Sequence, residues 1–97
     1  MDDINKIIIL YDYYEELLTE LQREYFEEYY FNNLSLSEIA DNKNVSRNAV
    51  HNQLKNTVEK LNEYETKLKM YEKTSKVKKI IKDKELREKV MDILEGE

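Results

Sequence analysis

The chain has 97 residues, which is enough for one small domain, over residues 1–97, with a single core. It has no cysteine and its only glycine is Gly96, so disulfides, thiolate metal sites and glycine-rich phosphate loops are excluded. The net charge of −5 is uneven, because residues 1–45 hold 11 acids and 3 bases whereas residues 46–97 hold 10 acids and 13 bases. Without proline or alternating apolar residues, the sequence predicts an all-α fold.

The N-terminal segment predicts a cytoplasmic protein. It begins with the acidic stretch Met1-Asp2-Asp3, and the longest apolar run, residues 7–11, is too short for a signal peptide or a membrane span. The lack of cysteine fits a reducing compartment. We therefore expect no membrane span and a location in the cytoplasm.

Two helices are predicted in the first third of the chain. Apolar residues recur at helical spacing over residues 4–14, which predicts the first helix. Thr19 and Gln22 have the spacing of a capping box, in which each side chain bonds the other residue's backbone amide. A second helix should therefore begin after Thr19 and end before Asn32 and Asn33.

Residues 35–60 carry the strongest signal, which is that of a helix-turn-helix. Ser35 and Glu38 form a second capping box, opening a short helix that runs to about Lys43. Asn44 tolerates the left-handed backbone that a tight turn between helices needs, and Ser46 can cap the next helix. The predicted helix-turn-helix core, with Val45 as the plug of the turn, is Ile39, Ala40, Val45, Val50 and Leu54.

The second helix of this unit would place its N-terminal residues in the major groove of DNA. Arginine can read guanine and asparagine can read adenine, each through two hydrogen bonds. The predicted DNA-binding residues are Arg47, Asn48, His51, Asn52 and Lys55. The alternative interpretation is a three-helix packing unit whose polar residues are simply solvated.

From Val50 to Tyr71, apolar residues recur in steps of four and three, interrupted by Thr57. This heptad pattern predicts one recognition helix with a stripe about 30 Å long. Two interpretations of its second half stay open, namely packing in the core and an interface of a homodimer. The positions concerned are Leu61, Tyr64, Leu68 and Tyr71.

The C-terminal part is lysine-rich over residues 67–84 and closes with a helix predicted over residues 83–95. Asp83 can cap this last helix, and Gly96 can end it. The lysines are interpreted either as a solvated face or as a contact with the phosphate backbone of a nucleic acid, including structured RNA.

Four blocks of the sequence resemble the YlxM family of small DNA-binding proteins from Gram-positive bacteria and mollicutes. They are Leu17–Gln22, Tyr29–Tyr30, Leu34–Ala40 and Val45–Val50. The resemblance covers most of residues 5–75. It implies a helix-turn-helix similar to region four of bacterial sigma factors. It also implies a regulatory role in the signal recognition particle pathway, because members are typically encoded beside its genes.

The chain departs from the family pattern at three places. Asn33 stands where an acid is usual, and Asn56 replaces a base. Asn48 and Asn52 stand where glutamine and aspartate are common. The departures in the recognition helix leave fewer positive charges there.

Nothing in the sequence predicts an enzyme or a bound cofactor. A lone histidine, His51, cannot form a metal site, and the paired carboxylates lie on polar helix faces. Two functions remain. One is a DNA-binding transcriptional regulator, and the other is a protein-interaction adaptor or RNA-binding accessory factor of the signal recognition particle pathway. A homodimer is expected in both cases.

Overall fold

The computed structural model describes residues 3–96, so the predicted acidic start at Met1 and Asp2 lies outside the described residues. The regular structure of residues 3–96 is entirely helical, which confirms the predicted fold class. The helices are α1 (Ile4–Tyr14), α2 (Glu20–Phe26), α3 (Leu36–Lys43), α4 (Arg47–Leu68), α5 (Met70–Ile80) and α6 (Lys84–Leu94). A 3-10 turn, Glu15–Leu17, follows α1, and a π-helical turn, Glu27–Phe31, follows α2. None of these helices has the length and apolar character that crossing a bilayer requires.

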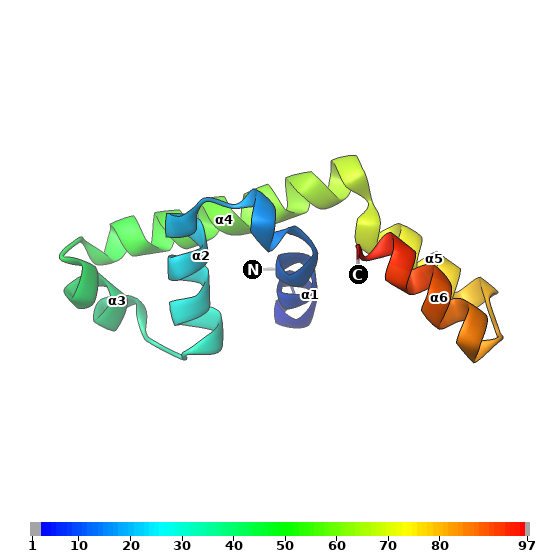
Figure 1. Ribbon diagram of the computed structural model, residues 1–97. Helices are drawn as coiled ribbons and strands as arrows, with labels where there is room; N and C mark the ends of the chain where they lie inside the picture. The colour runs from blue at the N-terminus through cyan, green and yellow to red at the C-terminus, as the bar shows by residue number, and fades with distance from the viewer. Residues whose placement is uncertain (1–2, 97) are drawn as a thin grey trace.

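The molecule is elongated, 51 × 23 × 22 Å, because α4 runs along most of its length (Figure 1). Helices α1, α2 and α3 lie along one side of α4, and we call this part, residues 4–68, the head. Helices α5 and α6 form an antiparallel hairpin beyond the end of α4, which we call the arm (Figure 1). The helix-turn-helix and the arm therefore occupy opposite ends of the molecule.

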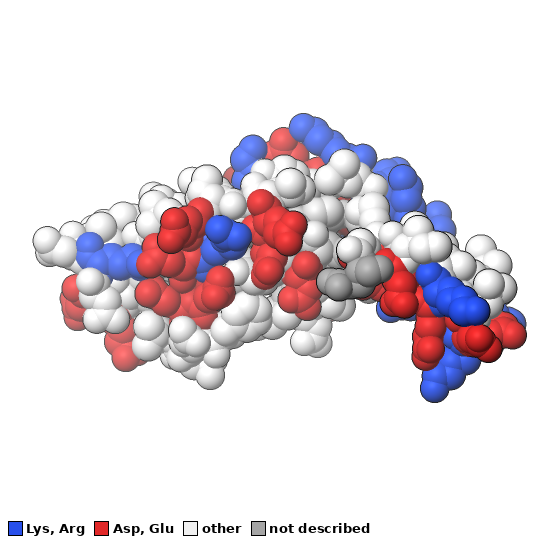
Figure 2. Space-filling view, viewed as in Figure 1, with Lys and Arg blue, Asp and Glu red and all other residues white. Residues whose placement is uncertain are grey.

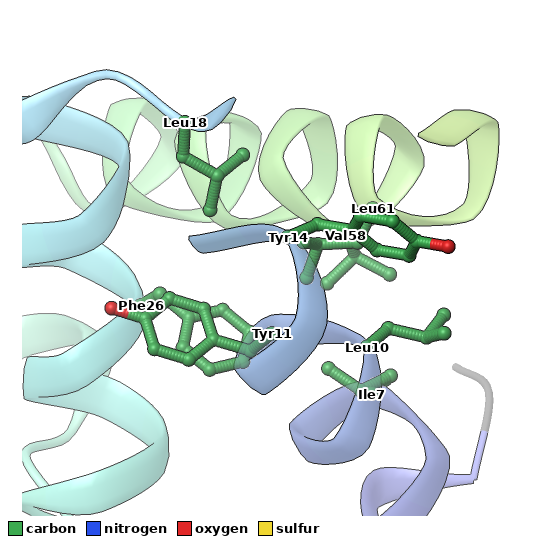
Figure 3. Close-up of a cluster of buried hydrophobic side chains, with 8 residues drawn as sticks. All are labelled: Ile7, Leu10, Tyr11, Tyr14, Leu18, Phe26, Val58 and Leu61. Atoms are coloured by element: carbon green, nitrogen blue, oxygen red, sulfur yellow. The ribbon is translucent and has the colours of Figure 1, made fainter. Parts of the chain in front are cut away.

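The larger of two core clusters joins α1, α2 and α4 (Figure 3). Phe26 is fully buried and stacks on Tyr11, with ring centroids 4.2 Å apart and planes within 2°. The cluster consists of Ile7, Leu10, Tyr11, Tyr14, Leu18, Phe26, Val58 and Leu61. Its position holds α4 rigidly against the rest of the head.

The predicted caps are all present. Thr19 and Gln22 close one capping box and Ser35 and Glu38 the other, with the four hydrogen bonds between 2.9 and 3.1 Å. The Ser46 hydroxyl accepts a hydrogen bond from the Ala49 amide at 3.0 Å, so α4 begins at its predicted residue. Asp83 likewise accepts from the Leu86 amide and opens α6.

The turn between α3 and α4 has the predicted left-handed residue. Asn44 has φ 56° and ψ 47°, and the next amide, that of Val45, donates to the Ala40 carbonyl at 3.0 Å. This bond closes the end of α3 and fixes the direction in which the chain enters α4.

The effect of a substitution at Asn44 on stability should depend on the left-handed backbone conformation rather than on side-chain contacts. We expect Asn44→Gly to leave the free energy of unfolding nearly unchanged and Asn44→Ala to lower it by about 1 kcal/mol, since a Cβ disfavours positive φ. Asn42→Ala, inside α3, is the control and should keep or raise stability because alanine is the better helix former. Urea denaturation would measure all three, and equal effects of Asn44→Gly and Asn44→Ala would contradict this explanation.

The prediction of one recognition helix from Val50 to Tyr71 is wrong at its C-terminal end. Helix α4 stops at Leu68, and Lys69 takes a left-handed conformation with φ 55° before α5 begins. The first amides of α5 are satisfied by side chains of the head. The Tyr14 hydroxyl accepts from Met70 at 3.0 Å, and the Glu65 carboxylate accepts from both Tyr71 and Glu72. These bonds replace the ones that a continuous helix would make.

Candidate nucleic-acid interface

Helices α3 and α4 pack through the smaller core cluster, as a helix-turn-helix requires. Four of the five predicted core residues lie in this cluster and are at least 95% buried. They are Ile39, Ala40, Val50 and Leu54. Tyr25 of α2 joins them, although the sequence analysis did not select it. Tyr25 and Tyr29 are four residues apart, as on one face of a helix, and this spacing could have indicated that Tyr25 faces the core.

The prediction that the fifth residue, Val45, lies in the core is wrong. Its side chain is 40% exposed and does not enter the cluster. Val45 directly precedes the cap residue Ser46, a position at which an apolar side chain covers the entrance of a helix without penetrating the core. Tyr25 of α2 lies in this cluster instead.

The five predicted DNA-binding residues all lie in the first nine residues of α4, and all five are exposed. They alternate with Val50 and Leu54, whose burial turns the opposite side of the helix inward. Within residues 3–96, none of the five side chains takes part in a hydrogen bond or an ion pair. Their donors and acceptors are thus available to an external ligand, as a recognition helix needs.

The charges around this surface limit where a polyanion can approach. Lys43, at the end of α3, is engaged within the head, since it lies 3.5 Å from Glu24 and 3.6 Å from Glu28 and covers the Tyr25 ring. Acidic side chains gather over α1 and α2 on the face seen in Figure 2. That face would therefore repel a polyanion.

A mainly apolar hollow of about 280 Å³ lies beside the recognition residues. Tyr29, Leu36 and Leu54 form its wall, and His51 and Lys55 complete its lining. Tyr29 and Leu36 are the two members of this surface that the sequence analysis missed. Apolar groups next to recognition residues can contact the methyl group of thymine.

Comparisons with known proteins agree with this geometry. Residues 1–95 match the family described as "Putative helix-turn-helix protein, YlxM / p13 like". The chain belongs to this family. It is 41% identical over 93 residues to a UPF0122 protein of Malacoplasma penetrans, with 93% of this chain and 87% of that protein covered. It is 43% identical to a UPF0122 protein of Fusobacterium nucleatum, with coverages of 86% and 81%. A third such protein, of Desulforamulus reducens, is 42% identical over 99% of this chain and 77% of its own length.

In this member of the YlxM and p13-like family, the four positions in the second half of the heptad pattern lie in two different environments. Leu61 is fully buried, and Tyr64 and Tyr71 pack against the larger core cluster. The Tyr64 hydroxyl also donates to the Leu17 carbonyl at 3.2 Å. Leu68, in contrast, is 45% exposed. Core packing therefore accounts for three of the four positions, two of them partly buried, and Leu68 is the most exposed of the four.

The lysines of residues 67–84 lie mostly on exposed surface. Two of them form ion pairs one helical turn away, Lys67 with Glu63 at 3.0 Å and Lys76 with Glu72 at 3.1 Å. Among the described residues, no three His, Cys, Asp or Glu side chains are grouped so that they could hold a metal ion.

Proposed function

We propose that this protein is a DNA-binding regulator that reads duplex DNA with the first turns of α4. The proposal depends on one observation: five exposed polar side chains, free of intramolecular bonds in the described part of the chain, lie on a helix whose other side is fixed to α3. A surface that is rigid and still has its hydrogen-bonding capacity is suited to reading base edges, because little ordering has to accompany binding.

The chemistry of the five residues assigns them different tasks. Arg47 can pair with O6 and N7 of guanine, and Asn48 and Asn52 can pair with N6 and N7 of adenine. Lys55 is suited to a phosphate oxygen, as a point charge. Because so few cations are present, the salt dependence of binding should be shallow, with a slope of log K against log salt of roughly −2 to −3 for each protomer.

We further propose that the protein acts as a cytoplasmic homodimer, because two recognition helices read a site of one duplex turn more selectively than one. Exposed apolar side chains of the arm support a second contact surface, with Ile80 75%, Leu86 53% and Ile93 79% exposed. Light scattering should then give about twice the 11.8 kDa mass of one chain at high micromolar concentration. A mass of one chain would refute the dimer.

The DNA-binding proposal is tested by fluorescence anisotropy with labelled duplex DNA at about 50 mM salt. Arg47→Ala with Lys55→Ala should weaken binding by about tenfold to a hundredfold. Arg87→Ala with Lys89→Ala on α6 removes the same charge from the other end of the molecule and should change affinity by less than about threefold. No binding at micromolar protein, or equal losses in the two double variants, would refute the proposal.

A second candidate function is that of an adaptor in the signal recognition particle pathway, the pathway to which the family resemblance points. The acidic face over α1 and α2 favours it, because such a face suits a basic protein partner (Figure 2). Parallel titrations with duplex DNA and with signal recognition particle RNA separate the candidates. A protein that ignores duplex DNA yet retains its fold would fit the adaptor or an RNA-binding accessory factor.

A further inference from the structure

An open groove of about 570 Å³ lies where α1, the end of α4 and the start of α5 meet. Four lysines line it from three different segments: Lys6 of α1, Lys69 at the left-handed junction, and Lys76 and Lys79 of α5. Basic side chains gather along the upper edge of Figure 2, over the second half of α4 and over α5. The groove belongs neither to the recognition surface nor to the core.

The two carboxylates of the groove offset only part of the charge of these four lysines. Glu65 is occupied by the Tyr14 hydroxyl and by two amides of α5, and Glu72 is paired with Lys76. Within residues 3–96, Lys6, Lys69 and Lys79 have no carboxylate within ion-pair distance. With four lysines and two carboxylates, the groove carries a net charge of +2.

We propose that this groove binds a small polyphosphate, such as the triphosphate of a nucleotide. Phosphate oxygens match lysine ammonium groups, and several linked phosphates can contact lysines from three segments at once. The hydroxyl of Ser75 also lines the groove and can donate to the same oxygens, whereas that of Thr66 already donates to the Asn62 carbonyl at 2.9 Å. Its volume falls in the range of small-ligand sites.

The position of the groove favours a small ligand over an extended nucleic-acid backbone. Along α4, the 22 residues from Arg47 to Leu68 span about 33 Å, so the groove is remote from the recognition residues. Between the two sites, α4 carries the exposed Glu59 and a Glu63 that is paired with Lys60 and Lys67. A continuous polyanion follows a continuous basic track, and these mixed charges do not form one.

Binding of tripolyphosphate to the full-length protein, followed by isothermal titration calorimetry and by the phosphorus NMR signal, tests the proposal. Lys76→Gln with Lys79→Gln should weaken binding at least about tenfold, as two phosphate contacts are lost. Lys69→Gly removes a third cation and keeps the left-handed backbone. Lys78→Gln with Lys82→Gln is the matched control, because both lysines lie in the same region but outside the groove, and it should change affinity by less than about twofold.

Each outcome of these binding experiments either supports or overturns the proposed polyphosphate site. Selective loss in the groove variants, with duplex binding unchanged, supports the proposal even if the DNA-binding proposal itself fails. No binding of tripolyphosphate, ATP or GTP at millimolar concentration overturns it. Equal losses in the groove and control variants overturn it as well, because they would indicate general attraction to lysine. Groove variants that lose only duplex DNA or RNA binding would identify a backbone contact in place of the small ligand.

Discussion

Replacing Phe26 with alanine is expected to lower the free energy of unfolding by about 3–5 kcal/mol. Phe26 is fully buried at the centre of the larger cluster, stacked on Tyr11 and 4.5 Å from the ring of Tyr30. The neighbouring rings come from separate elements and cannot collapse together to fill the space, so a cavity would remain. Since small domains are stable by about 5–15 kcal/mol, this change alone can unfold much of the protein.

Urea denaturation followed by circular dichroism measures this loss. Phe31→Ala is the matched control, because Phe31 is 44% exposed and contacts the rings of Tyr11 and Phe26 edge to face. It should cost less than half as much, since less apolar surface returns to water. Equal costs at the two positions would show that the stacked pair is not the centre of the core.

Local signals in the sequence were sufficient for most helix boundaries and for the turn. Thr19, Ser35 and Ser46 each bond an amide three residues ahead, and such caps depend only on residues close in sequence. Asn44 was identifiable for the same reason, because few residue types accept a left-handed backbone. The exposed positions on α4 followed from the buried spacing of Val50 and Leu54, which fixes the orientation of the helix.

Features set by contacts distant in sequence could not be predicted in this way. The break at Lys69 has neither glycine nor proline to signal it, because it depends on Tyr14 and Glu65, 56 and 6 residues away from the amides that they bind. The place of Tyr25 of α2 in the cluster of α3 and α4 also depends on a contact between residues far apart in sequence. The lysine groove likewise required α1 to place Lys6 beside α5, which periodicity within one helix cannot show.

The bonds that join the head to the arm are mostly polar. The Tyr14 hydroxyl donates to Glu65 at 2.6 Å, and burial together with this bond raises the pKa of Tyr14 to about 12, so the hydroxyl stays protonated at neutral pH. The hydroxyls of Tyr13 and Thr74 add a second link at 2.7 Å. Thr74 is the one buried residue of α5, and Met70 and Tyr71 are partly buried against the larger cluster, so polar bonds and a small apolar contact together dock the arm.

Removing the Glu65 carboxylate should weaken the docking of α5 while the head stays folded. Glu65→Ala leaves the Tyr14 hydroxyl and the amides of Tyr71 and Glu72 without their acceptor, and we expect a loss of about 2–4 kcal/mol in the local stability of α5. Glu65→Gln should lose less, because its amide oxygen can still accept from the backbone.

Hydrogen exchange of the full-length protein measures this effect region by region. Amides of residues 70–80 should exchange faster in Glu65→Ala, while those of α1 and of the first half of α4 keep their protection. Glu63→Ala is the matched control on the same helix, since Glu63 makes only exposed ion pairs with Lys60 and Lys67, and it should leave α5 unchanged. Faster exchange throughout the head in Glu65→Ala would mean that head and arm unfold as one unit. Unchanged exchange in α5 would mean that contacts other than those of Glu65 hold the arm in place.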